Sequence, residues 1–220
     1  MTALPGQCEL CRRWQRGRLC SDCAPAQTAL RCEGCGLRVA GSGLRCGHCL
    51  AAPLPFRRCI CAVDYADPWD RLIMAFKYHG QVELAGVLAD RLHAALLAQG
   101  VERPDRVLPV PLASERLAGR GYNQAWELAR RVATRLDCPA DAQVLDRPLA
   151  RSPQAGLGRA ERRRNLQGAF RVARPDAVAG RRIALVDDVL TTGATLAEAA
   201  QALLAAGAAE VQVWALARTP

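Results

Sequence analysis

Eight cysteines near the start of the chain have the spacing of metal ligands. They form four pairs, each with two residues between its members: Cys8 and Cys11, Cys20 and Cys23, Cys32 and Cys35, and Cys46 and Cys49. Two thiolates at this spacing can bind one tetrahedral ion from a single tight turn, and a second pair completes a Cys₄ site. Because no secretory leader is recognisable, this clustering favours metal over disulfides. The sequence therefore predicts a double zinc ribbon with two structural zinc ions.

The spacing does not decide which pairs share an ion. The connecting stretches have eight, eight and ten residues, and we expect consecutive pairs to join because this needs the shortest loop closures. His48 is not needed as a ligand, since Cys49 completes its pair. Closed Cys₄ sites are structural rather than catalytic, and whether the region also binds DNA or a protein stays open. Cys59, Cys61 and Cys138 are expected to pack as small apolar side chains.

A second chemical pattern follows an apolar run that starts at Ile183. Two carboxylates, Asp187 and Asp188, precede a loop of small and hydroxyl-bearing residues that opens a helix: Thr191, Thr192, Gly193, Ala194 and Thr195. Backbone N–H groups at such a helix start bind anions, and threonine hydroxyls add donors. The two acids suit the vicinal hydroxyls of a ribose and a nearby Mg²⁺. An ordinary capped turn is the alternative, but paired acids before this loop favour a phosphate site.

The elements expected around these residues are those of an α/β domain. Irregular sequence extends to about residue 57, and short apolar runs then alternate with helical patterns, which indicates a mostly parallel sheet. Strands are predicted at 60–65, 106–110, 182–186 and 210–217, with a short one at 140–145. Helices are predicted from residue 68 and at 82–99, 123–136 and 194–206. A polar turn with Gly119 and Gly121, a loop at 187–193 and a basic stretch at 147–168 connect them.

The composition favours a folded chain with an excess of positive charge. Of the 220 residues, 50% are hydrophobic and 23% are charged, which excludes a wholly disordered protein. No apolar run approaches the roughly 20 residues of a membrane-spanning helix, so we expect a cytoplasmic location without membrane insertion. The net charge of +9, which zinc-bound thiolates would lower to about +5, suggests an anionic partner.

Further motifs extend the pattern over nearly the whole chain. The 186–195 segment resembles the phosphoribosyl pyrophosphate motif of type I phosphoribosyltransferases. It is accompanied by Phe76-Lys77-Tyr78-His79-Gly80, Pro109-Val110-Pro111, Arg120-Gly121-Tyr122-Asn123-Gln124 and Asn165-Leu166-Gln167-Gly168-Ala169-Phe170. With the double zinc ribbon, these motifs resemble the ComF/GntX family of competence-associated proteins. The resemblance implies a double zinc ribbon at 1–57 and a type I phosphoribosyltransferase-like domain, a parallel sheet flanked by helices, at 58–220.

The resemblance also implies a ligand, phosphoribosyl pyrophosphate or a related ribose phosphate bound with Mg²⁺. Asp187 and Asp188 would meet the ribose hydroxyls, and residues 191–195 would hold the 5′-phosphate. Arg116 and Arg120 are candidate partners of the pyrophosphate, because arginine matches phosphate oxygens with two donors; an exposed helix face is the alternative. Lys77 is the one lysine among 30 basic residues, which suggests that the site needs a compact charge, although chance retention would also explain it.

Two functions stay open at the level of the sequence. In the first, the protein binds the ribose phosphate and takes part in uptake of single-stranded DNA during natural transformation, as the resemblance implies. The ribbon or the 147–168 stretch would then contact single-stranded DNA or a DNA-uptake helicase. In the second, an active phosphoribosyltransferase moves phosphoribose to a nucleobase or amine, and the ribbon is purely structural. Thr191 and Thr192 stand where some members of the superfamily place an acid, so no general base is assigned.

Overall fold

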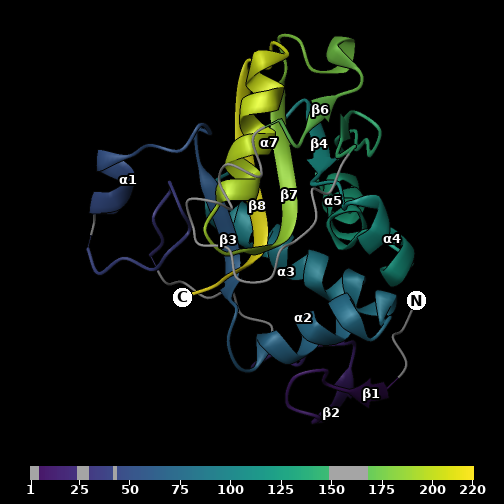
Figure 1. Ribbon diagram of the computed structural model, residues 1–220. Coiled ribbons are helices and arrows are strands. Elements are labelled where there is room, and N and C mark those ends of the chain that lie inside the picture. Colours follow the sequence, from purple (N-terminus) through teal and green to yellow (C-terminus); the bar gives the residue numbers. More distant parts are fainter. Residues whose placement is uncertain (1–4, 24–29, 42–43, 149–167) are drawn as a thin grey trace, which may run out of the picture.

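A parallel sheet of four strands forms the centre of the fold (Figure 1). The computed structural model describes residues 5–23, 30–41, 44–148 and 168–220. The strands are β3 (Cys59–Asp64), β4 (Arg106–Pro109), β7 (Arg182–Leu190) and β8 (Glu210–Arg218), in the order β3, β8, β7, β4. Each strand runs parallel to its neighbours. The predicted α/β class with a parallel sheet is therefore confirmed.

Helices cover both faces of this sheet (Figure 1). On one face lie α2 (Trp69–Tyr78), α3 (Ala85–Ala98) and α5 (Gln124–Arg135), and on the other lies α7 (Ala194–Ala205). Two short 3₁₀ helices, η1 (Val82–Leu84) and η2 (Pro175–Ala177), precede α3 and β7. The helix predicted at 82–99 therefore begins as a 3₁₀ turn. Within the described ranges, no helix is long and apolar enough to cross a membrane.

Alternation along the strands divides the apolar side chains between two cores. In β7, Ala184 and Val186 face the core beneath α3 and α5, whereas Ile183 and Leu185 face the core beneath α7. All four side chains are fully buried. Because helices cover both faces, successive residues are apolar rather than alternately apolar and polar. This explains why the central strands were recognisable in the sequence as continuous apolar runs.

The cysteine-rich region flanks the sheet domain at two places. It contains an antiparallel hairpin of β1 (Pro5–Gln7) and β2 (Trp14–Arg16), and the short helix α1 (Gly47–Ala51). Figure 1 shows the hairpin beside α2, and α1 out to the side of the sheet where β3 is the edge strand. Among the described residues before β3, the buried apolar side chains are Cys8, Cys20, Cys32, Cys49 and Phe56. The division of the chain at residue 57 stays a prediction.

The cysteines outside the four pairs are buried in the sheet domain. Cys59 and Cys61 of β3 are each 2% exposed and face the core beneath α7. Cys138 is also buried and belongs to the core on the opposite face. All three belong to the apolar cores, so the prediction that they pack as small apolar side chains is confirmed.

The polar turn predicted around Gly119 and Gly121 was wrong, because this segment contains the helix α4 (Ser114–Arg120). Gly119 lies within the helix, where glycine weakens the helical signal. Gly121 follows the last helical residue with a φ of 77°, the left-handed conformation with which many helices end. Glycine therefore serves as a stop signal here rather than as a sign of a turn.

The strand predicted at 140–145 is divided in two. Ala140 forms a single bridge with Val107 at the edge of the main sheet. Further along, β5 (Leu145–Asp146) pairs with β6 (Arg171–Val172) in a separate antiparallel ribbon. Most of the basic stretch predicted at 147–168 lies outside the described residues. Its two ends adjoin this small ribbon.

The two candidate acids lie inside a strand and not in the predicted loop. β7 continues to Leu190 because β8 runs beside it over the same length, with Asp187 opposite Ala215 and Val189 opposite Ala217. The neighbouring strand thus satisfies the backbone beyond the apolar run. Since successive strand residues point to opposite faces, the two carboxylates leave the strand on different sides.

Candidate functional site

The eight paired cysteines form two separate groups. The first cluster is Cys8, Cys11, Cys20 and Cys23, and the second cluster is Cys32, Cys35, Cys46 and Cys49. Within each cluster the four Sγ atoms lie within 4.8 Å of one another, and consecutive pairs are joined as predicted. The Sγ atoms are 3.6 Å apart between Cys11 and Cys20 and 3.8 Å apart between Cys35 and Cys46. A tetrahedral zinc thiolate has edges of about 3.8 Å, so each cluster fits one zinc ion.

Backbone donors prepare one thiol in each cluster for metal. The N–H of Cys20 donates to Cys8 Sγ at 3.4 Å, and the N–H groups of Gly34 and Cys46 donate to Cys32 Sγ at 3.3 and 3.2 Å. Burial opposes ionisation, but these donors outweigh it and lower the pKa of Cys8 to about 6 and that of Cys32 to about 7. Because metals bind the thiolate, these two residues are ready ligands at neutral pH.

At the carboxyl end of β7, an ion pair joins two of the predicted site residues. Lys77, in the last turn of α2, places Nζ 3.1 Å from Asp188 Oδ1, and both side chains are largely buried. Asp187 Oδ1 accepts the N–H of Asp188 at 2.8 Å. Burial, followed by the charge of Asp188, raises the pKa of Asp187 to about 8. Without a ligand, Asp187 therefore holds a proton near neutral pH, and a cation at this edge would favour its ionised form.

The predicted phosphate loop lies between these acids and α7. Thr191 and Thr192 are exposed, and the N–H of Ala194 donates to Thr192 Oγ1 at 3.4 Å. Gly193 caps α7 with a φ of 80°, a backbone conformation that strains residues with a side chain. Ala194 and Thr195 begin the helix and remain partly accessible. The loop thus presents the start of a helix to solvent at the carboxyl edge of the sheet, where an anion is favoured.

Two motifs that are distant in the sequence contact each other beside this edge. The guanidinium of Arg120 lies 5.0 Å from the ring centroid of Tyr78, which follows the paired lysine, and Nη1 donates to Gln124 Oε1 at 3.1 Å. The Tyr122 hydroxyl donates to the Phe76 carbonyl, and the two rings lie 5.7 Å apart. The end of α2 is therefore fixed against the junction of α4 and α5. This contact brings Arg120 to the same side of the sheet as Lys77.

Sequence reasoning did not single out Arg147, which the fold places near the acids. Its guanidinium lies 5.4 Å from the Phe170 ring centroid, and Nε is buried with no hydrogen-bond partner in the structure. Burial lowers the pKa of Arg147, the charge of Arg116 lowers it further, and Asp187 acts in the opposite direction. Arg116, Arg147 and Asp187 are thus close enough to interact. Nothing in the sequence distinguishes Arg147 from its many arginine neighbours.

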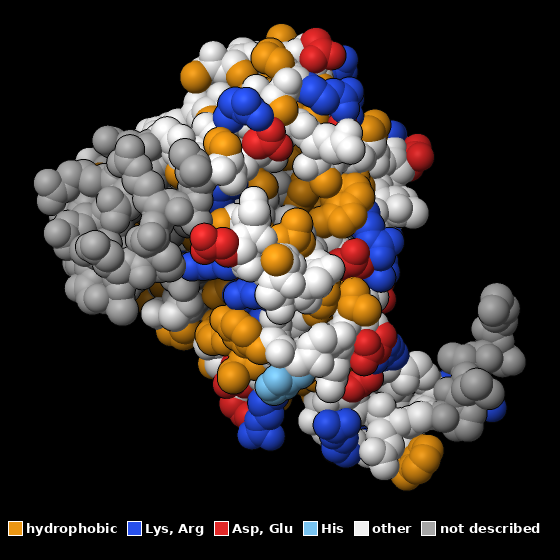
Figure 2. Space-filling model, turned by 45° about the vertical axis from the view of Figure 1, so that its right-hand side comes forward, with side chains coloured by type: hydrophobic (Ala, Val, Ile, Leu, Met, Phe, Trp, Pro, Cys, Tyr) orange, Lys and Arg blue, Asp and Glu red, His pale blue; other side chains and the backbone are white. Residues whose placement is uncertain are grey.

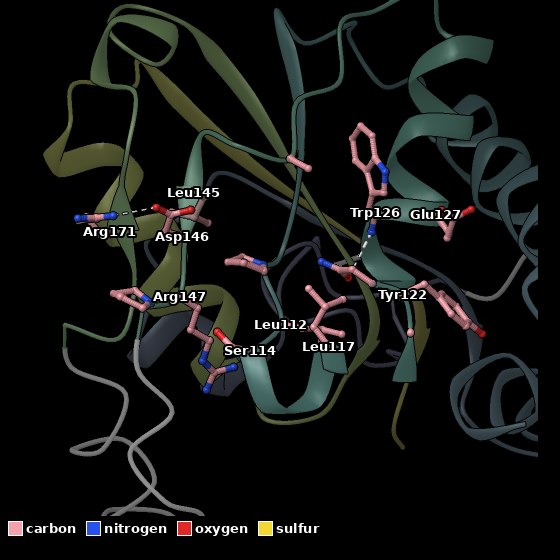
Figure 3. Close-up of a pocket in the computed structure, with 15 residues that line it drawn as sticks. Leu112, Ser114, Leu117, Tyr122, Trp126, Glu127, Leu145, Asp146, Arg147 and Arg171 are labelled. Atoms are coloured by element: carbon pink, nitrogen blue, oxygen red, sulfur yellow. Dashed lines mark hydrogen bonds and ion pairs between the residues drawn. The ribbon is translucent and has the colours of Figure 1, made fainter. Parts of the chain in front are cut away.

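A cavity of about 610 Å³ opens next to this arrangement, between α4, the start of α5 and the β5–β6 ribbon (Figure 3). Its apolar lining includes Leu112, Leu117, Trp126 and Leu145. Asp146 and Arg171 form an ion pair at 3.0 Å on one side. Figure 2 shows hydrophobic side chains gathered on this side of the molecule, with acidic and basic groups around them. Neither the two acids nor residues 191–195 line the cavity, so it lies beside the predicted phosphate loop rather than over it.

Comparisons with known proteins agree with this geometry. A model of the phosphoribosyl transferase domain matches residues 123–220. The chain is 41% identical to the DNA utilization protein YhgH of Escherichia coli O157:H7 over 229 residues, covering 100% of both chains. It is 35% identical to competence protein F of Haemophilus influenzae over 206 residues, covering 91% of this chain and 90% of the relative. The chain belongs to the ComF/GntX family. The resemblance seen in the sequence is therefore confirmed.

The match between this ComF/GntX chain and YhgH covers both chains completely, so it includes the cysteine-rich region as well as the sheet domain. Among solved structures, a glutamine phosphoribosylpyrophosphate amidotransferase from B. subtilis, complexed with ADP and GMP, aligns with 64% of this chain and 30% of its own. Its identity is 19% and its TM-score is 0.45. The ComF/GntX chain combines two four-cysteine groups with a phosphoribosyl transferase domain.

Proposed function

We propose that the protein binds phosphoribosyl pyrophosphate, or a related ribose phosphate, with Mg²⁺ at the carboxyl end of its parallel sheet, and that it serves DNA uptake in natural transformation. The observation that carries this proposal is the buried Lys77–Asp188 pair beside a helix-opening loop. Acids for ribose hydroxyls, a cation and backbone donors for phosphate meet at one edge. The relatives named for competence and DNA utilization support the biological role.

Each group in the site has a separate task in this proposal. Asp187 and Asp188 accept hydrogen bonds from the ribose hydroxyls, and the N–H groups of residues 191–195 donate to the 5′-phosphate. Arg116 and Arg120 offer paired donors to the pyrophosphate. Bound Mg²⁺ would neutralise pyrophosphate charge. Asp187 loses its proton when hydroxyl donors and cation replace it, so ligand binding releases a proton at neutral pH.

Titration calorimetry with phosphoribosyl pyrophosphate and Mg²⁺ tests the site. The matched comparison is a double variant, Asp187→Asn with Asp188→Asn, which keeps the size of both side chains and removes both charges. We expect it to lose at least a hundredfold in affinity. Asp90→Asn, at an exposed acid of α3 that pairs with Arg135, is expected to bind as the unmodified protein does. No binding by the unmodified protein, or equal binding by the double variant, would refute the proposal.

Phosphoribosyl transfer is the second candidate function, favoured by the phosphoribosyl transferase match. A nitrogen of the acceptor would attack the anomeric carbon of the ribose, and the bond to pyrophosphate would break with its electron pair going to pyrophosphate. The loop offers Thr191 and Thr192 rather than an acid, so the acceptor would have to lose its proton to solvent or to a residue not yet assigned. Pyrophosphate release in a screen of nucleobases and amines would establish transfer.

The β1–β2 hairpin supplies a surface for single-stranded DNA. Trp14 is 70% exposed, and Arg12 and Arg16 are exposed beside it. Exposed aromatic rings among cations stack on successive bases, and each stacked base adds about 1–3 kcal/mol. We expect Trp14→Ala to weaken binding of a thymidine oligonucleotide about tenfold and Trp14→Phe to retain it. Leu44→Ala, at another exposed apolar residue of the region, is the control, and equal affinities for all variants would refute this surface.

A further inference from the structure

A buried arginine at the end of β8 joins the second cluster to the phosphate loop. Arg218 is 9% exposed. Its Nε donates to the carbonyl of Cys35, a residue of the second cluster, at 2.7 Å, and its Nη1 donates to the carbonyl of Leu190 at 3.3 Å. Leu190 is the last residue of β7 and directly precedes Thr191. One guanidinium therefore holds a cysteine knuckle and the residue before the loop together.

Further contacts make the same connection rigid. The N–H of Thr219 donates to the Leu190 carbonyl at 3.0 Å, so that carbonyl accepts two donors from the end of β8. Leu54, in the segment after the second cluster, lies close to Gly193, where an added Cβ would be 3.7 Å from Leu54 Cδ1. The N–H of Cys59 also donates to the Glu33 carbonyl within the cluster at 2.6 Å. The second cluster, the sheet edge and the loop thus form one packed unit.

The first cluster contacts a different part of the molecule. Arg18 Nη1 donates to the Glu83 carbonyl of η1 at 2.7 Å. Leu10 and Leu19 pack against the core that α2 and α3 share. These contacts lie on the side of the sheet domain that α2 and α3 cover, and Figure 1 shows the β1–β2 hairpin below α2, away from α1. The two clusters have the same ligands, but the described contacts link the second one to the loop.

We propose that Arg218 is a positioning residue that couples metal at the second cluster to the phosphate loop. Metal bound at the second cluster fixes the Cys35 carbonyl, and the planar fork of arginine can span two acceptors at once. When that knuckle is released, the buried guanidinium loses an acceptor and no longer holds Leu190 in place. Metal at the second cluster, and not at the first, therefore determines how well ordered the loop is and how tightly it binds phosphate. The affinity part of this inference rests on the ribose phosphate site proposed above.

Hydrogen exchange in the ligand-free, zinc-loaded protein tests the coupling without relying on ligand binding. Arg218→Lys keeps the charge but cannot span both carbonyls. We expect the amides of residues 190–195 to exchange about tenfold faster in this variant, with zinc content unchanged. Arg91→Lys is the matched control, because Arg91 is 3% exposed and donates to the Ala62 carbonyl on the other face. Unchanged exchange of the loop in Arg218→Lys, or equal acceleration in both variants, would overturn the proposal.

Single cysteine variants test the asymmetry between the clusters. Cys46→Ser removes a ligand of the second cluster that is not the residue held by Arg218, and Cys11→Ser removes a ligand of the first. We expect each variant to lose one zinc ion by elemental analysis. Loop exchange should then be about tenfold faster in Cys46→Ser and unchanged in Cys11→Ser. Affinity for phosphoribosyl pyrophosphate with Mg²⁺ should be lowered in Cys46→Ser and unchanged in Cys11→Ser. Equal effects of the two variants on loop exchange would contradict the coupling.

The two proposals fail in different ways. If the unmodified protein does not bind phosphoribosyl pyrophosphate, the ribose phosphate site fails, but faster loop exchange in Arg218→Lys still supports the positioning role. If the ligand binds and the loop exchange is unaffected by Arg218→Lys and Cys46→Ser, the site stands and the coupling fails. Thermal unfolding of every variant shows whether it remains folded. If either Arg218→Lys or Cys46→Ser is unfolded, the loop exchange of the other variant decides whether the coupling exists.

Discussion

The cysteine-rich region and the sheet domain are stabilised by different interactions. Before β3, most of the buried apolar side chains among the described residues are cysteines of the two clusters. In the sheet domain, two apolar cores lie on opposite faces of four hydrogen-bonded strands. A segment of this length cannot bury enough apolar surface to fold alone, so metal ligands replace a core. The difference shows that one chain can use metal for one part and apolar burial for another.

The two clusters also differ from each other, in how each is attached to the sheet domain. The second cluster is tied to the sheet by charged groups as well as backbone, because Arg31 and Arg38 both pair with Asp64 at the end of β3. The first cluster is attached through the hydrogen bond from the Arg18 side chain to the Glu83 carbonyl and through the apolar side chains of Leu10 and Leu19. Attachment to the sheet edge gives the second cluster influence over the site. The first cluster contacts helices instead, and among the described contacts none links it to the loop.

Removal of zinc tests the comparison most severely. Structural zinc contributes about 10 kcal/mol or more to folding of a small metal-dependent module. We therefore expect a strong chelator to abolish amide protection in the cysteine-rich region while the amides of β7 and β8 remain protected. Hydrogen exchange with parallel zinc analysis measures this. Loss of protection in both parts together would show that the two parts fold as one unit.

A substitution that creates a cavity in the apolar core should have the opposite effect: it should destabilise the sheet domain and leave zinc binding intact. Leu185 is fully buried beneath α7, and replacing such a leucine with alanine costs about 3 kcal/mol. We expect Leu185→Ala to lower the free energy of unfolding of the sheet domain by this amount and to leave the zinc content at its original value. Urea unfolding followed by circular dichroism gives the free energy. Leu204→Ala, at a partly exposed position on α7, should change it by less than about 0.5 kcal/mol.

Protonation of Asp187 makes the stability of the sheet domain depend on pH. Its pKa is about 8 in the folded protein against an ordinary value of 3.8, so between these values the folded state binds a proton that the unfolded state has lost. Stability must then fall as pH rises through this window, by at most about 1.4 kcal/mol per pH unit. Because the side chain is partly accessible, we expect a fall of about 2 kcal/mol between pH 6 and 8.

Asp187→Asn should remove this dependence. Urea unfolding of the ligand-free protein at several pH values gives the comparison, and the variant should gain on the unmodified protein as pH rises. Cys8 and Cys32 also titrate in this range, because their lowered pKa values are about 6 and about 7, so only the difference between the variant and the unmodified protein reports on Asp187. Asp146→Asn, at an acid in the β5–β6 ribbon, is the control. Parallel pH profiles for the unmodified protein and Asp187→Asn would show that Asp187 is ionised throughout.

The smallest expected effect concerns the helix cap that orients the α4–α5 junction. Asn123 Oδ1 accepts the N–H groups of Ala125 and Trp126, and Nδ2 donates to the Val110 carbonyl at 3.0 Å. Loss of such a cap costs about 1 kcal/mol, so Asn123→Ala should lower the free energy of unfolding by this amount. Asn123→Asp keeps the cap and removes the donor, and should recover most of the loss. If Asn123→Asp is as unstable as Asn123→Ala, the contact with Val110 matters more than the cap.

Spacing and periodicity predicted most of the elements. Four C-x-x-C pairs predicted the eight cysteines of the clusters, because metal coordination depends on short local spacing. Their consecutive pairing was predicted from the shorter loop closures. The central strands were predicted because sheets covered on both faces need continuous apolar runs. The order of strands and the helix α4 were not predicted, since strand pairing is a long-range choice and Gly119 weakened the helical signal. The length of β7 depended on its partner β8.

The sequence by itself determined the ligands of the clusters, the family and the candidate acids with their loop. These features are local, so residue type and spacing are sufficient to find them. The tertiary structure alone decided that Lys77 meets Asp188, that Arg147 lies near Asp187 and that Arg218 bridges Cys35 and Leu190. Each of these contacts joins segments far apart in the chain. In a protein with so many arginines, burial and the position of acceptors distinguish one arginine from another, and both arise only when the sheet has formed.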